Sequence, residues 1–326
     1  MKRILFLSKG ERASSTRYRA LQFFDRFAAA GYRPAHATIA GHPAAYLTAL
    51  RAARGADIVV LQRKTFPAPL LWLLRRCTRR LVFDFDDAIF CNSDGTPSAT
   101  RMRRFAATVR ACDDVFAGNA FLATTAARFN GAVTVVPTCV EPAKYRVTAA
   151  KPADRIELVW IGSRSTRKYL EDALPALRLA AARVPRLRLK IVADFDLPGA
   201  GLDTVAVPWS AAGEAMELAS AHIGIAPMRH DDWSRGTCAL KVLQYMAAGL
   251  PVVSSDAGVN ADVVEPGGNG LLATCDADWA EAIARLAADA PLRERMGANG
   301  RATVAAGYSV DAVFGIIRRA LERAPG

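Results

Sequence analysis

The sequence lacks any long hydrophobic run. Its composition is 52% hydrophobic, yet no stretch of about 18 residues is both apolar and uncharged, so it predicts no membrane-spanning helix. The apolar stretch behind the basic start covers only Ile4–Leu7, which is short for the core of a signal peptide and long enough for a strand. We therefore expect a cytoplasmic protein.

Closely spaced cysteine pairs are also lacking. The six cysteines are scattered, none forms a CxxC pair, and no histidine stands beside them at the spacing of a metal site. Scattered cysteines in a cytoplasmic protein are usually reduced and buried. We therefore expect no metal and no cofactor. The cysteines are Cys77, Cys91, Cys112, Cys139, Cys238 and Cys275.

The net charge of +12 leaves three classes of partner to consider: nucleic acid, an anionic membrane surface and phosphorylated small molecules. Few aromatic residues are present, no basic run is interleaved with them, and no nucleic-acid-binding motif occurs, so we expect no nucleic-acid partner. One basic cluster, Arg75, Arg76, Arg79 and Arg80, follows the apolar stretch Leu70–Leu74. This pattern fits either peripheral contact with the inner face of the plasma membrane or an ordinary amphipathic helix.

Short apolar runs alternate with helical periods along the whole chain, which predicts parallel sheets covered by helices on both faces. The pattern breaks at 137–154, where three prolines occur, and then restarts. We therefore predict an α/β fold with two doubly wound Rossmann-like domains facing a central cleft, over residues 1–145 and 155–307. The predicted strands are 3–7, 57–61, 81–85, 114–117, 133–136, 157–161, 187–192, 204–207, 223–226, 251–254 and 270–273. The predicted helices are 17–30, 69–78, 101–111, 122–129, 170–184, 216–219, 239–248 and the region from 277 onward.

The most specific segment runs from Ile223 to Val264. Here a strand leads through a polar loop containing Gly236 into a helix and a further strand ending in Ser254. A helix start presents free backbone N–H groups and a positive dipole end, which suits a diphosphate. Lys241 stands in the first turn, where a cation is unfavourable without an anion; the alternative is a lysine that extends into solvent.

This segment, LKVLQYMAAGLPVVSSDAGVNADVV, followed by NGLLA and MGANGRATV, resembles the nucleotide-sugar site of GT-B glycosyltransferases of the group 1 superfamily, which includes many bacterial envelope-glycan enzymes. The resemblance covers nearly the whole chain in the same order. The other matching pieces are Ser14–Arg17, Phe83–Asp87, Gly118–Asn119, Val136–Thr138 and Trp160–Ser163.

The resemblance implies a hexosyltransferase-like, metal-independent enzyme of glycan or glycoconjugate biosynthesis. Its N-terminal domain would bind the acceptor and its C-terminal domain a nucleoside-diphosphate sugar. A C-terminal helix, 308–326, would pack back on the N-terminal domain. Lipid-linked glycans, lipopolysaccharide and small molecules all remain possible acceptors.

One departure from the family concerns the donor site. The family often carries two glutamates with seven residues between them, the first on the donor sugar and the second on the ribose. The matching positions here are Gly236 and Gln244. Gln244 can still hydrogen-bond ribose hydroxyls, whereas Gly236 supplies no carboxylate. A subset of the superfamily has a lysine three residues before the second position, as Lys241 is here.

The resemblance also assigns donor residues around the turn 161–170, where basic side chains would neutralise the leaving diphosphate. Arg164, Arg167 and Lys168 are the candidates, and the alternative is a capped helix start with exposed basic residues. Ala239 and Leu240 would add diphosphate contacts, and Gly162 and Ser163 nucleoside contacts.

Three further groups are candidates for contact with the donor, the acceptor or the cleft. Arg17 and Arg19 follow the first strand and either contact phosphate or belong to a capping loop. Asp84, Asp86 and Asp87 crowd negative charge at a strand end. Asp86 or Asp87 would be a catalytic base, a ligand for Mg²⁺ or Mn²⁺, or a turn cap. The donor sugar or the cleft would be contacted by Trp233, Gly236, Thr237 and Asn119, while His36 and His222 are expected to pack or lie on the surface.

Other functions are compatible with the missing glutamate. A catalytically inactive nucleotide-sugar-binding protein, or a partner subunit of an active enzyme, would not need it. An epimerase acting on a nucleotide sugar is a third possibility, because fold alone does not fix function.

Overall fold

The computed structural model describes residues 1–39 and 43–323, which fold into two compact units. The first unit comprises Met1–Cys139, Asp231–Cys238 and the chain from Val310 onward; the second comprises Val140–His230 and Ala239–Ser309. The segment 231–238 lies within the predicted range 155–307 but joins the first unit. Residues 324–326 of the predicted C-terminal helix lie outside the described residues.

Six parallel strands form the sheet of the first unit, in the order β2-β1-β3-β4-β5-β6. The central strands are almost wholly buried, as expected where helices cover both faces. Sequence analysis did not predict the edge strand β2, which is half exposed and contains Pro34. The strands are β1 (Lys2–Ser8), β2 (Tyr32–Thr38), β3 (Ile58–Gln62), β4 (Arg80–Phe85), β5 (Asp114–Ala117) and β6 (Val133–Val135).

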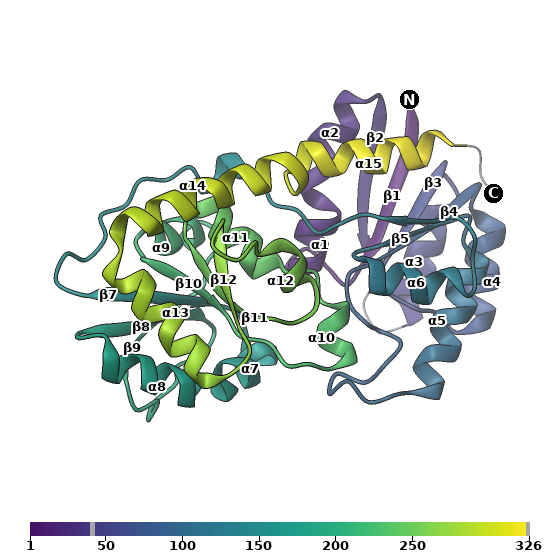
Figure 1. Cartoon of the computed structure of the whole chain (residues 1–326). Coiled ribbons are helices and arrows are strands. Elements are labelled where there is room, and N and C mark those ends of the chain that lie inside the picture. Colours follow the sequence, from purple (N-terminus) through teal and green to yellow (C-terminus); the bar gives the residue numbers. More distant parts are fainter. Residues whose placement is uncertain (40–42, 324–326) are drawn as a thin grey trace. The chain divides into compact units, whose positions relative to one another are not determined.

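Helices cover both faces of this sheet (Figure 1). One core cluster packs Leu61, Phe83 and Val115 under α3 to α6, and another packs Phe6 and Phe116 under η1, α2 and α15. The predicted helix 17–30 is divided by a 3₁₀ turn, and α3 was not predicted. The elements are α1 (Ser14–Arg19), η1 (Leu21–Phe23), α2 (Phe24–Ala29), α3 (Pro43–Ala53), α4 (Ala68–Cys77), α5 (Ala99–Ala111), α6 (Ala120–Ala127), α10 (Asp232–Gly236) and α15 (Val310–Glu322).

The C-terminal helix α15 packs on the sheet of the first unit. Its residues Val313 and Ile317 are buried in the core cluster of that face. The Arg80 guanidinium pairs with Asp114 and donates to the carbonyl of Ala320 at 3.0 Å, which satisfies a backbone acceptor at the helix end. Arg80 therefore anchors α15 from inside the protein.

The second unit also contains a six-stranded parallel sheet, in the order β12-β11-β10-β7-β8-β9. Its main core cluster packs Leu158, Ile191 and Ile225 against α8 and α13. The strands are β7 (Ile156–Ile161), β8 (Leu187–Ala193), β9 (Asp203–Pro208), β10 (Ile223–Ala226), β11 (Val252–Ser255) and β12 (Gly270–Ala273). The other elements are η2 (Pro142–Tyr145), η3 (Arg164–Thr166), α7 (Arg167–Asp172), α8 (Leu174–Arg183), α9 (Glu214–Ala219), α11 (Leu240–Ala248), α12 (Gly258–Val263), α13 (Asp276–Ala288) and α14 (Ala290–Gly307).

Both sheets follow the predicted α/β alternation, with each strand parallel to its neighbours. The residues that the structure describes form no helix long and apolar enough to cross a membrane.

Candidate functional site

The first strand of the second unit ends in a turn that has no room for a side chain. Gly162 follows β7, and a Cβ there would lie 2.1 Å from the indole of Trp160, which is fully buried. The backbone of this turn therefore lies directly against the core at the carboxyl edge of the sheet. Open α/β sheets bind their ligands at that edge.

The hydroxyl of Tyr245 separates β7 from β10 at the same edge. It accepts from the backbone nitrogen of Ile161 at 2.9 Å and donates to the carbonyl of Ile225 at 3.2 Å. The two strands pair directly only at Ile223 and Gly224 of β10. Because the strand order reverses between β7 and β10, this is the topological switch point of the sheet, where a ligand crevice is expected.

Helix α11 begins with an unusual residue. Ala239, its N-cap, is left-handed with φ of 53°, a strained conformation for a residue other than glycine, and alanine supplies no side-chain cap. The first-turn N–H groups are therefore left to a ligand or water. Leu240 and Lys241 lie in this turn, and the Lys241 Nζ is 5.3 Å from the centroid of the Trp160 ring.

The turn after β7 carries the other predicted donor residues. Ser163 and Thr166 form a capping box, so the predicted capping role of this segment is present in the structure. Arg164 is exposed, and its backbone nitrogen donates to Asp194 at 2.9 Å. The Lys168 Nζ lies 5.0 Å from the Tyr169 ring centroid. The candidate cations therefore lie on η3 and α7, directly after the Gly162 turn, while Arg167 pairs with Glu171.

The predicted ribose residue, Gln244, belongs to a buried polar group on α11. Its Nε2 donates to the Tyr145 hydroxyl at 3.3 Å, and that hydroxyl donates to the Glu214 carboxylate at 2.6 Å. Neither Tyr145 nor Glu214 was predicted from the sequence. Glu214 lies 30 residues before Gln244 in the numbering, on another helix, so no local pattern could have indicated it.

In the first unit, one of the three predicted carboxylates is enclosed in a buried ion pair. Asp84 accepts two hydrogen bonds from the guanidinium of Arg19, and both residues are buried. Arg19 also donates to the carbonyl of Val136 at 2.6 Å. Burial disfavours the charged guanidinium, but the adjacent Asp84 outweighs this and raises the pKa of Arg19. Arg19, considered above as a phosphate contact, is therefore enclosed in an internal ion pair.

The other two carboxylates share a cation that sequence analysis did not identify. Arg63 follows β3 and forms ion pairs with Asp87 and, at 4.0 Å, with Asp86. Its φ of 57° is left-handed, and such strain in a non-glycine residue is often found at functional sites. The buried Asp86 Oδ1 accepts no hydrogen bond from the described residues. An arginine directly after a strand was the only signal available in the sequence.

The segment 231–238 packs against these carboxylates. Gly236 is buried against Ala88, and the Cys238 thiol donates to the carbonyl of Asp86 at 3.3 Å. The side-chain amide of Asn119 donates to the carbonyls of Arg235 and Thr237. Asn119 and Thr237 thus meet at the end of β5.

The two remaining candidates also lie in the first unit. Trp233, on α10, is partly buried and packs against the core cluster that includes Cys238. Arg17, on α1, is half-buried, with its guanidinium carbon 5.7 Å from the Tyr18 ring centroid. Within the described ranges, no group of three or more His, Cys, Asp or Glu side chains could hold a metal ion.

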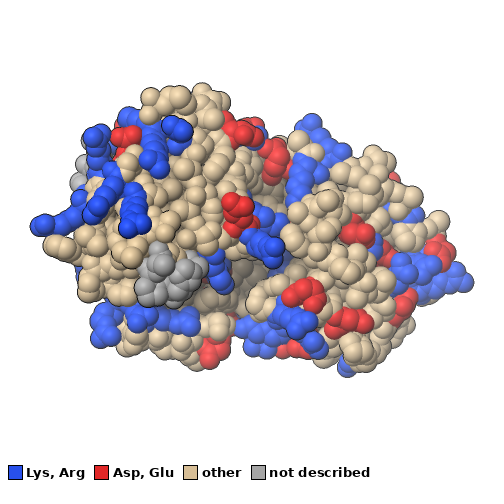
Figure 2. Space-filling model, turned by 180° about the vertical axis from the view of Figure 1, so that it is seen from behind, with Lys and Arg blue, Asp and Glu red and all other residues tan. Residues whose placement is uncertain are grey.

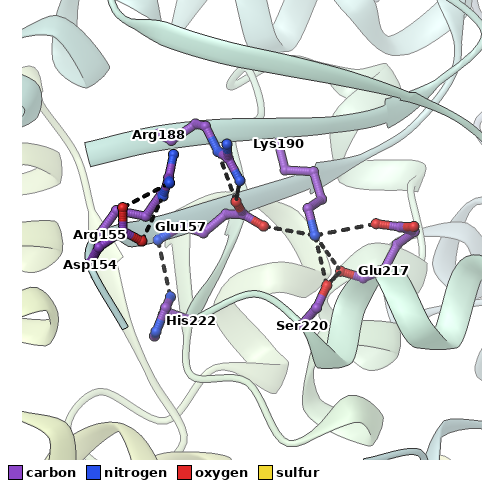
Figure 3. Close-up of polar contacts among 8 residues, drawn as sticks. All are labelled: Asp154, Arg155, Glu157, Arg188, Lys190, Glu217, Ser220 and His222. Atoms are coloured by element: carbon purple, nitrogen blue, oxygen red, sulfur yellow. Dashed lines mark hydrogen bonds and ion pairs between the residues drawn. The ribbon is translucent and has the colours of Figure 1, made fainter. Parts of the chain in front are cut away.

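A second charged cluster lies at the opposite edge of the second sheet, where strands begin (Figure 3). Glu157 on β7 forms ion pairs with Arg188 and, at 2.7 Å, with Lys190, which also reaches Glu217 at 3.2 Å. The His222 Nδ1 accepts from the backbone nitrogen of Glu157 at 3.1 Å. These charges neutralise one another inside the unit, which indicates a structural role.

Residues 155–289 match the family model of the glycosyl transferases group 1. No curated protein gives a significant sequence match. Similar solved structures include sucrose-phosphate synthase from Thermosynechococcus elongatus, with 17% identity, a TM-score of 0.75 and coverage of 98% of this chain and 99% of that one. A glycosyltransferase from Rickettsia africae has 12% identity and a TM-score of 0.74, with 99% and 100% covered. Anabaena HepE in complex with UDP has 16% identity and a TM-score of 0.71, with 98% and 99% covered.

The likeness to these structures extends over nearly the full length of each chain and confirms the predicted fold. The family match falls on the second unit and includes the Gly162 turn and the start of α11. The chain therefore has the two-domain GT-B fold, and its residues 155–289 match the group 1 glycosyl transferases.

Proposed function

We propose that this protein transfers a hexose from a nucleoside-diphosphate sugar to a hydroxyl group of an acceptor, without a metal ion, in glycan or glycoconjugate biosynthesis. The observation that carries the proposal is the group 1 match over the switch point of the second sheet. Anabaena HepE, a similar structure, was solved with UDP-glucose, which supports a nucleotide-sugar donor.

The second unit would hold the donor. The N–H groups of α11, including those of Leu240 and Lys241, receive the diphosphate at the positive end of the helix dipole. The Lys241 ammonium, with Arg164 and Lys168, neutralises the charge that develops on the departing nucleoside diphosphate. Such fixed cations perform the task that a divalent metal performs in other transferases. Gly162, Ser163 and Gln244 would contact the nucleoside.

The first unit would supply the base. Asp86 is the better candidate, because its buried Oδ1 accepts no hydrogen bond from the described residues and its nearest cation, Arg63, is 4.0 Å away. Asp87 is closely paired with Arg63 instead. Deprotonating the acceptor hydroxyl gives the nucleophile that attacks the anomeric carbon of the donor. The candidates for sugar contacts are Arg17, Asn119, Trp233 and Thr237. Gly236 has no side chain with which to contact the sugar.

The test is a thermal-shift screen with UDP, GDP, ADP, TDP and CMP, each with Mg²⁺ and with EDTA. A rise of the melting temperature with one nucleoside diphosphate, equal in both conditions, supports the proposal and selects the donor series. The matching nucleoside-diphosphate sugars are then incubated with the protein, and the released nucleotide is quantified.

The outcomes separate the candidate functions. Release of nucleoside diphosphate without metal supports transfer, and an isomerised donor identifies an epimerase. Tight nucleotide binding without any turnover, even with a panel of hydroxyl acceptors, favours the inactive sugar-nucleotide-binding protein. That alternative is motivated by Gly236, where a side chain would meet Ala88 and no carboxylate is available.

Peripheral contact with an anionic membrane is part of the same proposal. In the first unit α3 packs beside α4, and Leu47 and Trp72 are 57% and 59% exposed on these helices. The guanidinium of Arg76 lies 4.5 Å over the Trp72 ring. Figure 2 shows Lys and Arg side chains gathered at the left of that view with few acidic ones among them. An exposed aromatic side chain beside an arginine suits an anionic bilayer surface.

Of the four arginines in the predicted cluster, Arg76 and Arg79 remain exposed, while Arg80 is buried and Arg75 pairs with Asp113. Co-sedimentation with phosphatidylcholine vesicles containing phosphatidylglycerol tests the contact. The double variant Trp72→Ala/Arg76→Ala is expected to stay in solution, whereas Arg183→Ala, an exposed arginine of the second unit, should sediment like the wild type. Equal sedimentation of all three proteins would contradict membrane contact at this face.

A further inference from the structure

We infer that Glu214 is a positioning residue for the nucleoside ribose and that it acts through Tyr145 on the amide of Gln244. The inference rests on the proposed function and deepens it, because it assigns the orientation of the group that contacts the ribose. Neither Glu214 nor Tyr145 belongs to a motif that the sequence analysis recognised.

Glu214 is an ionised carboxylate held inside the second unit. It is 1% exposed, and its Oε1 accepts from the Tyr145 hydroxyl and from the Lys144 ammonium, each at 2.6 Å. Its Oε2 accepts from the indole nitrogen of Trp209 at 2.8 Å. Burial alone would raise the pKa of Glu214, but the hydrogen bonds from Lys144 and Tyr145 outweigh it and lower the pKa below its ordinary value. The carboxylate therefore only accepts hydrogen bonds at neutral pH.

The ionised carboxylate of Glu214 fixes the direction of each hydrogen bond between Glu214, Tyr145 and Gln244. A tyrosine hydroxyl has one proton, and the Tyr145 proton is donated to Glu214. Towards Gln244, the Tyr145 oxygen can therefore only accept, so the atom of Gln244 that lies 3.3 Å from it must be the amide nitrogen. The amide carbonyl, Oε1, is consequently turned to the other side of the side chain.

The oriented carbonyl has the chemistry that a ribose needs. Gln244 lies three residues after Lys241, on the same side of α11, so a nucleotide whose diphosphate lies at the helix start brings its ribose towards Gln244. A ribose hydroxyl can donate to this carbonyl oxygen, whereas a reversed amide would offer it no acceptor and leave the hydroxyl proton without a partner on Gln244. Glu214 thus determines that the ribose meets the carbonyl oxygen of Gln244 and not its amide nitrogen.

The same series of hydrogen bonds explains why glutamine is present at position 244. A glutamate there would place a second buried carboxylate beside the Tyr145 oxygen, whose only proton is already donated to Glu214. Two carboxylates competing for one proton would repel each other. A glutamine offers the donor that Tyr145 requires and retains one acceptor oxygen.

The experiment measures the dissociation constants of UDP, GDP, ADP and TDP, and of the corresponding forms that differ only at the 2′-hydroxyl, by calorimetry. The proteins are the wild type, Glu214→Gln, Tyr145→Phe and the exchange variant Glu214→Gln/Gln244→Glu. We expect the wild type to prefer the ribonucleotide about tenfold over its 2′-deoxy form, the value of one good hydrogen bond. Glu214→Gln and Tyr145→Phe should lose this preference, and the exchange variant should recover part of it.

A merely structural role for Glu214 would weaken both nucleotide forms equally and leave their ratio unchanged, and that result would overturn the inference. Tyr145→Phe retains the ring and the Lys144–Glu214 ion pair, so it remains informative if Glu214→Gln unfolds. If the wild type binds none of the nucleotides, the proposed function fails as well. If it binds them but shows no 2′-hydroxyl preference, only the positioning role is removed.

Discussion

Gly236 and Ala88 are packed backbone against backbone. A Cβ at position 236 would lie 2.5 Å from the backbone nitrogen of Ala88 and 2.6 Å from its Cβ. A side chain at position 236 would therefore require Ala88 to move. We predict that Gly236→Glu destabilises the protein by about 1–3 kcal/mol or more, as overpacking does, and does not increase turnover.

Urea unfolding and the rate of nucleotide release measure these two effects. Gly131→Ala is the control, because a Cβ at Gly131 meets no atom within 4 Å and its φ is not positive. It should unfold like the wild type. Wild-type stability together with faster turnover in Gly236→Glu would show that the site accepts the family glutamate after all.

The two carboxylates beside Arg63 should differ in their contribution to catalysis. Asp87 is closely paired with Arg63, whereas the Asp86 Oδ1 is buried without a hydrogen bond from the described residues. We expect Asp86→Asn to lower kcat by about 10²–10⁴-fold, the usual contribution of a general base, with the nucleotide affinity unchanged. Asp87→Asn should lower kcat less and destabilise the fold more, because it leaves the Arg63 cation with one partner fewer.

Steady-state kinetics and nucleotide calorimetry on both variants check this prediction. Asp84→Asn is a useful third protein, because Asp84 is enclosed with Arg19 and should affect stability first. A larger fall of kcat in Asp87→Asn than in Asp86→Asn would reverse the assignment of the base.

Most of the fold was predictable because its strands are short apolar runs bounded by turn residues. The predicted segments 114–117, 223–226 and 270–273 coincide with β5, β10 and β12. The strand β2 was missed because an edge strand exposes half of its side chains, and its Pro34 and His36 interrupt the apolar pattern. Edge strands carry little of the hydrophobic signal on which such predictions depend.

The site was only partly predictable. Gly162 and Lys241 belong to local patterns, a strand end and a helix start, and the structure places them at one edge of one sheet. Arg63 and Glu214 matter through tertiary contacts with residues far away in the sequence, so no spacing rule could find them. The sequence also could not reveal that residues 231–238 join the first unit, because their hydrogen bonds to Asn119 are tertiary.

The stability of the second unit should fall as the pH drops below neutrality because of His222. Burial lowers the pKa of His222 to about 4, and the nearby cations Lys151 and Arg293 act in the same direction. The unfolded chain therefore takes up a proton near the ordinary pKa, about 6.5, where the folded protein does not. Above a pH of about 6.5 the free energy of unfolding has its full value. As the pH falls from there towards 4, it decreases by on the order of 2 kcal/mol.

Urea unfolding between pH 7 and pH 4.5 measures this loss, and His222→Asn is the matched variant. The asparagine oxygen can accept the hydrogen bond that the backbone nitrogen of Glu157 donates to Nδ1. It carries no titratable group, so the pH slope should be smaller in the variant. His36, whose pKa is also lowered by burial, remains in both proteins, and its contribution cancels in the comparison. Identical slopes would mean that His222 titrates normally.

Lys241 provides the most direct test of the donor site. Its ammonium lies above the Trp160 ring, which attracts a cation, and in the uncapped first turn of α11, where a cation is unfavourable unless an anion binds. Lys241→Ala should weaken nucleoside-diphosphate binding by roughly 1.5–3 kcal/mol, the value of a charged hydrogen bond. Arg183→Ala removes the same formal charge from an exposed position on α8 and serves as the control. Because distant charges are screened by salt, the control should bind like the wild type at physiological ionic strength. If the two variants bind the nucleotide equally well, the diphosphate lies elsewhere, and the uncapped N–H groups of α11 must be satisfied by water.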